Sequence, residues 1–371
     1  MAERPAPLVL VAMPPSVAAF GTYAAVAEMT QRLLAAELSQ RLGRLGAAVA
    51  PLLPDGATHW GRWFTAGARE ALAAAPADAP VDALGYVGAG SLALLPDAGL
   101  DELLSPTAGE VVANNRFSTD AFVVAGDIDR ALAALEGCAT DNAAVRCLES
   151  AGFTARVVGG PWSRFDLDTP LDAALLRVAG RLPGTRRLAG SVSGFLEMAQ
   201  LPGGRGLEVP HLAEVGAVMR DRSAQLLVAG RVPTATAMYL ETETACRVRL
   251  FVEERGMRSA RDVAPRSFLA GFMERSSPAE LVAELGTLAD AVVLDTRVLM
   301  AARSGSSDAS AWPAEEDRFA SDFGDASRVG TGWLHELTQA ASASATPFLL
   351  GGHTLVSDGL RLIVDAAWSG R

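Results

Sequence analysis

The stretch FDLDTPLDAALL, residues 165–176, places two acidic residues directly before the start of a predicted helix. Thr169 and Pro170 are residue types favoured at the N-cap and in the first turn of a helix. Asp166 and Asp168 alternate with apolar residues and stand at the end of the preceding strand. Such a carboxylate pair suits Mg²⁺, although a carboxylate near a helix start also stabilises the helix by about 0.3–1 kcal/mol. The stretch indicates an α/β fold and leaves a metal site and a structural role open for the pair.

Strand-like and helix-like segments alternate along the chain on both sides of this stretch. Residues 8–12 (LVLVA) are typical of a buried strand, and residues 23–45 carry leucines at helical spacing. This alternation predicts an α/β fold with a mostly parallel sheet. We expect further strands at residues 47–53, 82–88, 110–114, 121–125, 154–158, 224–229, 246–252, 291–295 and 347–350. We expect further helices at residues 60–75, 128–135, 142–151, 171–178, 192–199, 209–219, 234–244, 278–289 and 333–341, and a Ser/Asp-rich loop over residues 303–325.

The length of the chain favours two domains. Domains commonly hold roughly 100–200 residues, and this chain has 371. Residues 183–206 are rich in glycine and proline, which marks a connection between packed elements. We therefore predict a first α/β domain over residues 1–182, a connector over residues 183–206, and a smaller second α/β domain over residues 207–371.

The composition argues against a nucleic-acid partner and restricts how a phosphate can be bound. The net charge is −11, which is a poor match for the phosphates of a duplex. The chain contains no lysine, and all 32 basic residues are arginine. A Walker A lysine and a Schiff-base lysine are therefore excluded. A phosphate must be bound by arginine side chains or by backbone N–H groups.

Short apolar runs and sparse metal-ligand residues exclude further classes. Residues 8–13 form an apolar run that ends at Pro14, whereas a transmembrane helix needs about 20 apolar residues. We expect no membrane partner and a cytoplasmic protein. Cys138, Cys147 and Cys246 form no CxxC pair, so we expect buried thiols rather than a disulfide framework or a zinc site. The four histidines form neither HxH nor HExxH, so no short motif in the sequence predicts a transition-metal site.

The stretch FDLDTPLDAALL resembles the closing motif of small nucleotidyltransferases with the GT-A-type fold. That superfamily includes the molybdenum-cofactor guanylyltransferases and the phospholactate guanylyltransferases, and its typical motif is a hydrophobic residue followed by D-[ILV]-D-T-P-E-D-L. The resemblance covers about half of the chain, from Pro7 to roughly Leu182. It implies a Rossmann-like N-terminal sandwich with a mostly parallel sheet. It also implies that Asp166 and Asp168 are catalytic and bind Mg²⁺, which neutralises phosphate charge during nucleotidyl transfer.

The chain departs from that family in three features. Residues 90–104 (GSLALLPDAGLDELL) resemble the family's G-D-x-P-L-L segment, but Ser91 stands at the position of the metal-binding Asp. Pro14 and Pro15 follow the first strand where the family has a glycine-rich loop, and proline has no N–H to offer a phosphate. The family's lysine is missing. One hypothesis is a divergent nucleotidyltransferase-like protein that binds a nucleoside phosphate or a nucleotide-activated small molecule with Mg²⁺. The alternative is a catalytically degenerate scaffold or metabolite sensor, with any activity in the C-terminal domain.

Polar residues follow predicted strands of the N-terminal half. Asn114, Asn115 and Arg116 present amide and guanidinium groups that suit a sugar, a base or a phosphate. We expect Ser91 to contribute to the same ligand. A hairpin turn would also explain the two asparagines. Residues 140–142 (TDN) precede a predicted helix and are expected to cap it.

The C-terminal half holds a second set of candidate ligand-binding residues. Arg231 lies between a predicted strand and a helix, where helix N–H groups and an arginine favour an anion. Asp295, Arg297 and His353 stand at or after predicted strand ends, the edge where open α/β sheets bind ligands. If these strands are neighbours, His353 would converge with Asp295 and Asp358 and would act as a general base; a structural histidine in a glycine turn is the alternative. We expect a small-molecule nucleotide or sugar-phosphate ligand, and a chain this apolar is able to form a homodimer.

Overall fold

The computed structural model describes residues 6–14, 19, 21–54, 56, 59–76, 81–160, 162–254 and 264–369. These residues form two compact units, each with its own parallel or mostly parallel sheet. Unit 1 is made of Met1–Ala18, Glu28–Asp168 and Arg186–Phe195, and unit 2 is made of Ala19–Ala27, Thr169–Thr185 and Leu196–Arg371. The division therefore falls inside the FDLDTP stretch, between Asp168 and Thr169, rather than at residue 182.

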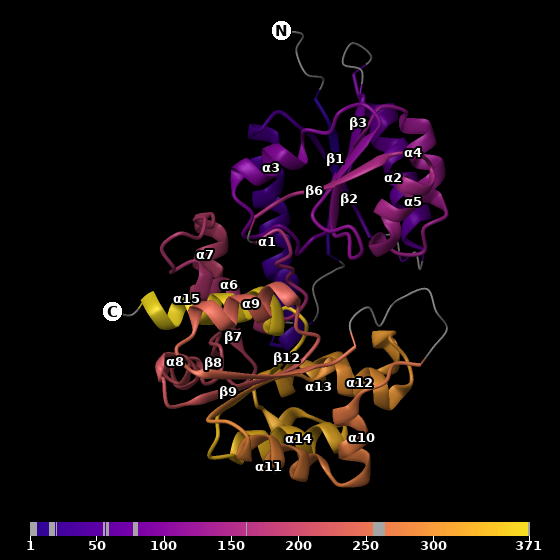
Figure 1. The fold of residues 1–371 in the computed structure, drawn as a ribbon. Helices are drawn as coiled ribbons and strands as arrows, with labels where there is room; N and C mark the ends of the chain where they lie inside the picture. The colour runs from indigo at the N-terminus through magenta and orange to yellow at the C-terminus, as the bar shows by residue number, and fades with distance from the viewer. Residues whose placement is uncertain are drawn as a thin grey trace. The chain divides into compact units, whose positions relative to one another are not determined.

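The sheet of unit 1 consists of six strands, which are β1 (Leu8–Ala12), β2 (Ala48–Leu52), β3 (Ala83–Val87), β4 (Glu110–Ala113), β5 (Ala121–Ala125) and β6 (Thr154–Val157). Their order is β2-β1-β3-β5-β4-β6. Figure 1 labels β1, β2, β3 and β6 of this sheet. β5 runs antiparallel to β3 and β4, and the remaining neighbours pair in parallel. The α/β prediction with a mostly parallel sheet is confirmed for this unit.

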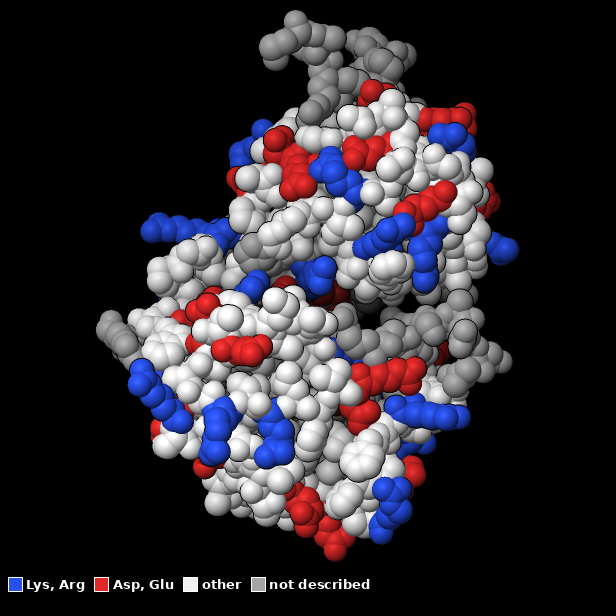
Figure 2. All heavy atoms as spheres, in the orientation of Figure 1, with Lys and Arg blue, Asp and Glu red and all other residues white. Residues whose placement is uncertain are grey.

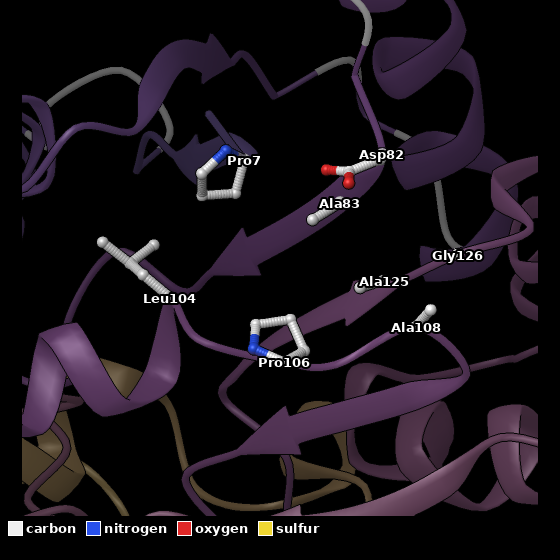
Figure 3. A pocket seen from close by; sticks show the side chains of 8 residues that line it. All are labelled: Pro7, Asp82, Ala83, Leu104, Pro106, Ala108, Ala125 and Gly126. Atoms are coloured by element: carbon white, nitrogen blue, oxygen red, sulfur yellow. The ribbon is translucent and has the colours of Figure 1, made fainter. Parts of the chain in front are cut away.

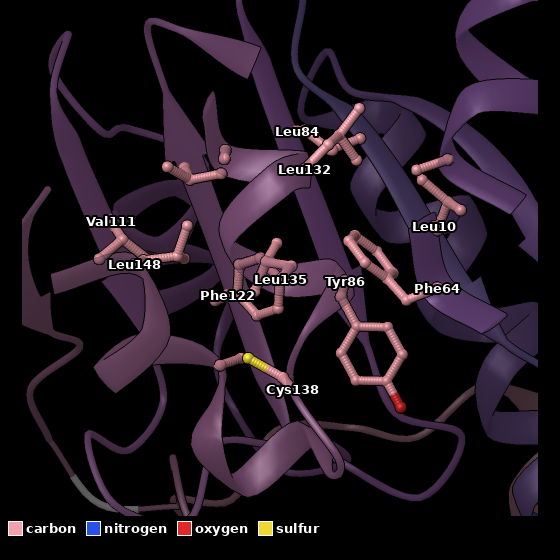
Figure 4. Close-up of a cluster of buried hydrophobic side chains, with 14 of the residues drawn as sticks. Leu10, Phe64, Leu84, Tyr86, Val111, Phe122, Leu132, Leu135, Cys138 and Leu148 are labelled. Carbon is pink, nitrogen blue, oxygen red and sulfur yellow. The ribbon is translucent and has the colours of Figure 1, made fainter. Parts of the chain in front are cut away.

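Helices pack on both faces of this sheet and create two cores. They are α1 (Tyr23–Arg44), α2 (Trp60–Ala74), α3 (Asp97–Leu103), α4 (Ile128–Glu136), the 3₁₀ turn η1 (Asp141–Ala143) and α5 (Ala144–Ser150). Successive side chains of a strand point to opposite faces. Leu10 therefore packs with Phe64 of α2 and Leu132 of α4 (Figure 4), whereas Val9 packs with Leu38 of α1 on the other face. Both faces of the sheet are thus buried, which leaves its edges for polar groups.

The sheet of unit 2 consists of four parallel strands, which are β9 (Gln225–Gly230), β10 (Arg247–Val252), β11 (Ala291–Asp295) and β12 (Phe348–Gly351). Their order is β10-β9-β11-β12. The chain passes from β9 to β10 on one side, and β11 then lies on the other side of β9. The strand order therefore reverses between β9 and β11, the kind of place where open α/β sheets bind ligands.

The remaining elements are α6 (Pro170–Ala179), α7 (Gly190–Met198), the hairpin β7 (Gln200–Leu201) and β8 (Arg205–Gly206), α8 (Leu212–Arg220), α9 (Thr234–Glu243), α10 (Phe268–Arg275), α11 (Pro278–Thr287), α12 (Arg297–Ser304), α13 (Glu315–Asp322), α14 (Gly332–Ala343) and α15 (Leu360–Ser369). The prediction of a loop over residues 303–325 is wrong, because α13 lies within that range. Phe319 is buried, and Asp322 forms an ion pair with Arg297, so distant contacts hold this polar segment in a helix.

The cysteine prediction is wrong for two of the three residues. Cys138 and Cys147 form a disulfide with a Cα–Cα distance of 6.8 Å. Cys246 is the buried free thiol that was predicted. The pair forms because Cys138 follows the end of α4 and Cys147 lies in α5, two helices that pack together.

The surface carries mixed charge. Figure 2 shows arginine and carboxylate side chains interspersed over the visible face rather than separated by sign. Within the described ranges, no helix is both long and apolar enough to cross a bilayer.

Candidate functional site

The candidate site of unit 1 lies at the edge of the sheet where the parallel strands end. β5 is antiparallel, so its start lies at the same edge as the ends of β3 and β4. The backbone N–H of Gly88, after β3, donates to the carbonyl of Asp120, before β5, at 2.8 Å. Asn114, the first residue after β4, donates its backbone N–H to the carbonyl of Ala121 at 3.0 Å. Loops that are distant in sequence therefore meet at one edge, where α/β sheets bind ligands.

Asn114 is buried and holds Asp120 in place. Its side-chain oxygen accepts from the backbone N–H groups of Asp120 and Ala121, each at 3.0 Å. Its side-chain nitrogen donates to Asp120 Oδ2 at 3.0 Å and to the carbonyl of Ser163 at 3.3 Å. Asn114 was predicted to contact a ligand, but these four hydrogen bonds make it the residue that orients the Asp120 carboxylate.

The Asp120 carboxyl group has a strongly raised pKa. Burial raises the pKa of Asp120 to about 7, the hydrogen bond from Asn114 opposes this rise, and the carboxylates of Asp141 and Asp168 add to it. The same group of charges acts on Tyr86, whose hydroxyl pKa is raised by burial and by Asp141, Asp120 and Asp166. The edge therefore gathers negative charge that favours a proton or a cation.

The segment with Asp166 and Asp168 is fixed to the loop after β3. The backbone N–H of Leu167 donates to the carbonyl of Gly90 at 3.2 Å, and Gln31 Nε2 donates to the carbonyl of Leu167 at 2.7 Å. A Cβ atom at Gly90 would lie 2.4 Å from the Leu167 carbonyl oxygen, so only glycine permits this approach. The two predicted carboxylates thus flank an anchored residue at the end of β3.

The start of α6 is capped by other residues of the stretch. Thr169 accepts from the backbone N–H of Asp172 at 3.2 Å, and the Asp172 carboxylate accepts from the Thr169 backbone N–H at 2.8 Å. This reciprocal pair is a capping box. Thr169 is therefore the N-cap of α6 and Asp172 is its partner, while the Asp166 carboxylate accepts from the backbone N–H of Leu167 at 3.1 Å.

The donor set suits a cation that arrives with a phosphate ligand. Among the residues that the structure describes, no group of three or more His, Cys, Asp or Glu side chains is arranged to hold a metal by itself. Mg²⁺ in proteins is usually bound by one or two carboxylates together with substrate phosphates and water. The negative charge of Asp168 acts on the Asp120 carboxyl group, so a cation at this edge would lower the repulsion between the two carboxylates.

The other predicted residues of unit 1 lie in structural contacts. Ser91 is buried, and its hydroxyl donates to the carbonyl of Gly88 at 3.0 Å. Asn115 accepts from the backbone N–H of Phe117 at 3.1 Å, as in an Asx turn. Arg116 forms a two-pronged ion pair with Glu149 of α5, with Nη2 to Oε1 at 2.5 Å and Nε to Oε2 at 3.2 Å. Arg116 is thus directed towards α5.

Unit 2 brings a second set of predicted residues together where β9 and β11 end. Arg231, directly after β9, contacts Asp295 with Nε to Oδ2 at 2.6 Å and Nη2 to Oδ1 at 3.0 Å. Asp295 is fully buried; burial opposes ionisation, but Arg231, His353 and Arg297 together hold its pKa below the usual range. Position 230 requires glycine, because its φ is 130° and a Cβ atom there would lie 2.3 Å from Asp295 Cβ.

Arg297 and His353 take different positions beside this pair. Arg297 is buried and contacts Asp322 through both terminal nitrogens, each at 2.6 Å, so its side chain holds α13. His353 is exposed, lies directly beyond Gly352 after β12, and acts electrostatically on Asp295. The strands β9, β11 and β12 are neighbours, as the convergence of Arg231, Asp295 and His353 requires.

Sequence reasoning missed Asp120 and Asp141 as site residues. Asp120 was not singled out in the sequence, and Asp141 was assigned to a helix cap. Asp141 does accept from the backbone N–H of Asn142 at 2.8 Å, but its charge also reaches Tyr86 and Asp120. The available signal was that Asp120 directly precedes the apolar strand AFVVA; its position became clear only with the antiparallel pairing of that strand.

A hollow at the opposite edge of the unit 1 sheet does not compete with this site. It has a volume of about 80 Å³ and is lined by Pro7, Asp82, Ala83, Leu104, Pro106, Ala108, Ala125 and Gly126 (Figure 3). Ligand pockets commonly measure roughly 300–1,000 Å³. The lining offers one carboxylate among small apolar side chains, so it lacks the groups that would bind a nucleotide.

No protein-family model and no curated protein matches this chain.

Proposed function

We propose that unit 1 binds a nucleoside phosphate or a nucleotide-activated small molecule, together with Mg²⁺, as a divergent nucleotidyltransferase-like domain of the GT-A type. The observation that carries this proposal is the gathering of Asp120, Asp141, Asp166 and Asp168 at the edge where β3 and β4 end. Burial raises the pKa of Asp120, the charges of Asp141 and Asp168 add to this rise, and Asn114 orients the Asp120 carboxylate. A site with this much negative charge repels a free anion, but it attracts a cation that is bound to a phosphate group.

The architecture of unit 1 supports the same proposal. The resemblance requires a mixed, mostly parallel sheet, and the six strands of unit 1 have that form (Figure 1). β1 lies between β2 and β3, so the strand order reverses between β1 and β3. The loop after β3 carries Gly90, which anchors the segment with Asp166 and Asp168. The carboxylates therefore lie beside the reversal point, where ligands of open sheets are bound.

Each residue has a defined part in the proposed site. Asp120 and Asp168 hold the cation, and Asp141 and Asp166 add negative charge around it. Asn114 positions Asp120, and Gly90 permits the close approach of Leu167. Mg²⁺ would neutralise charge on the phosphates of the ligand. Because the chain has no lysine, the remaining phosphate charge is left to arginine side chains and backbone N–H groups.

A second candidate function lies in unit 2, where Arg231 favours an anionic small molecule. Its guanidinium is held by the buried Asp295, and the side chain as a whole is 18% exposed, so it is fixed in orientation and partly accessible. Arg231 precedes α9, and Pro233 at the N-cap of that helix gives no side-chain cap to the first-turn N–H groups. A phosphate or carboxylate would meet an oriented arginine and these N–H groups.

A thermal-shift panel of nucleoside triphosphates, nucleoside diphosphates and nucleotide sugars, with and without Mg²⁺, tests both candidates. A ligand at a hundred times its Kd stabilises a protein by about 2.7 kcal/mol. A Mg²⁺-dependent shift that disappears in Asp168→Asn but persists in Asp101→Asn, an exposed carboxylate of α3, supports the unit 1 site. A Mg²⁺-independent shift that disappears in Arg231→Met places binding in unit 2. No shift with any nucleotide contradicts both.

A further inference from the structure

The disulfide between Cys138 and Cys147 closes a short loop beside the acidic edge of unit 1. The two cysteines are nine positions apart, and η1 with Asp141 lies between them. Cys138 is buried and belongs to the core cluster that contains Tyr86 and Phe122, as Figure 4 shows. Cys147 is half-buried in α5. The bond therefore joins the core of unit 1 to the helix next to the loop.

The closed loop and α5 contact the 114–120 loop at several points. Asn142 accepts a hydrogen bond from the Ser118 hydroxyl at 2.8 Å. Glu149 of α5 holds Arg116 through the ion pair described above. The charge of Asp141 reaches Asp120 itself. The position of the loop that follows β4 thus depends on where residues 139–149 are held.

The Cys138 end of the loop is fixed tightly to α2. The backbone N–H of Gly61 donates to the carbonyl of Cys138 at 2.9 Å, and that of Trp60 donates to the carbonyl of Ala139 at 3.2 Å. A Cβ at Gly61 would lie 2.1 Å from the Leu135 carbonyl oxygen, so the start of α2 packs directly on the end of α4. The disulfide extends this fixed point to α5.

We propose that the Cys138–Cys147 disulfide is a redox-sensitive clamp on the acidic site of unit 1. In the oxidised protein the bond holds Asp141, Asn142 and α5 against the 114–120 loop. In the reduced protein α5 is held by packing alone, and the loop that carries Asp120 is less firmly ordered. The consequence for ligand affinity rests on the proposed nucleotide site; the clamp itself does not.

The chemistry is thiol–disulfide exchange with a small disulfide such as oxidised glutathione. The thiolate of the more accessible Cys147 attacks one glutathione sulfur, which forms a mixed disulfide and releases one glutathione thiolate. The Cys138 thiolate then attacks the Cys147 sulfur and releases the second glutathione. Two protein thiols lose two protons and two electrons, and one glutathione disulfide becomes two thiols. A dithiol such as dithiothreitol reverses both steps.

Thiol counting and amide hydrogen exchange on the full chain test the clamp without any nucleotide. After treatment with oxidised glutathione, alkylation of the denatured protein should modify Cys246 alone, and after dithiothreitol it should modify all three cysteines. Exchange in residues 114–120 and 139–150 should be faster in the reduced protein, on the order of tenfold. The double variant Cys138→Ala/Cys147→Ala should show the faster exchange in both conditions. Cys246→Ser, which removes the buried thiol of unit 2, should respond to dithiothreitol as the wild type does.

Two results would overturn the clamp. One is alkylation of all three cysteines after oxidation, which would mean that the pair does not form. The other is a disulfide that forms while exchange in residues 114–120 stays the same on reduction. Because neither readout uses a ligand, failure of the nucleotide proposal and failure of the clamp are separate outcomes.

Discussion

Asn114 and Asp120 exchange hydrogen bonds in both directions: the Asn114 amide donates to Asp120 Oδ2 at 3.0 Å, and its oxygen accepts from the Asp120 backbone N–H at 3.0 Å. The pair bridges the end of β4 and the start of β5. It fixes the Asp120 carboxylate at the edge of the sheet where Asp141, Asp166 and Asp168 also contribute negative charge. The Asp120 carboxylate is thus both oriented by Asn114 and close to like charge.

The raised pKa of Asp120 predicts how stability depends on pH. Its folded-state pKa of about 7 exceeds the unfolded value of about 3.9, so the folded protein holds this proton more tightly. The resulting stabilisation is complete below pH ~4 and is lost as pH rises through ~7. In EDTA, urea unfolding at pH 5 and pH 8 should show a larger loss of stability in the wild type than in Asp120→Asn. Asp101→Asn should behave as the wild type; equal losses in all three proteins would refute the assignment.

Asn114→Ala should destabilise the protein by about 2–4 kcal/mol, because it removes four hydrogen bonds and leaves buried partners unsatisfied. Asn115→Ala is the matched control. Asn115 accepts one hydrogen bond from Phe117 and should cost less than about 1 kcal/mol. Urea unfolding of both variants measures the difference. Equal effects of the two substitutions would mean that Asn114 does not hold the edge together.

Gly90→Ala should displace the segment that carries Asp166 and Asp168, because the new Cβ would lie 2.4 Å from the Leu167 carbonyl oxygen. We expect a loss of about 1–3 kcal/mol in the free energy of unfolding and weaker Mg²⁺–nucleotide binding. Gly43→Ala in α1 is the contrasting variant, since the space around Gly43 is open. It should stabilise the helix by about 0.5–1 kcal/mol and leave binding unchanged. Thermal unfolding and ligand titration of both variants decide the matter; unchanged binding in Gly90→Ala would count against the anchored segment.

Removing one partner of the buried ion pair Arg297–Asp322 should destabilise the protein strongly, whereas replacing both partners together should destabilise it less. Arg297→Met leaves the Asp322 carboxylate buried without its partner and should cost about 3–5 kcal/mol. The double variant Arg297→Met/Asp322→Leu should be more stable than either single variant, because it leaves no unpaired charge. Urea unfolding of the three proteins measures the coupling. Additive losses in the double variant would show that the pair does not hold α13.

Strands with buried apolar sequences were predictable almost to the residue. LVLVA at Leu8–Ala12 and AFVVA at Ala121–Ala125 match their predicted ranges. A run of five apolar residues between turn residues is too short for most helices, so a buried strand is the structure that fits it. The helix at α13 was not predictable locally, because it lies in a segment, residues 303–325, that is rich in Ser and Asp. It is held by burial of Phe319 and by the ion pair with Arg297, contacts that no local window contains.

The candidate site was predictable in part. Asp166 and Asp168 were predictable because two acidic residues at a strand end, followed directly by Thr-Pro, form a pattern that spans only a few residues of sequence. Asp120 and Asp141 did not, because their proximity depends on the antiparallel pairing of β5 and on the packing of α4 against α5. The Cys138–Cys147 bond has the same cause, since sequence separation alone does not bring two thiols together.

Whether the carboxylates of unit 1 hold a cation together with a nucleotide is measured by Mn²⁺ binding, followed by electron paramagnetic resonance in the presence of each nucleoside triphosphate. We expect tightly bound Mn²⁺ that depends on the nucleotide, with affinity reduced about 10–100-fold in Asp120→Asn and Asp168→Asn and unchanged in Asp101→Asn. Mn²⁺ that stays free with every nucleotide, or that binds equally to all four proteins, would contradict this expectation.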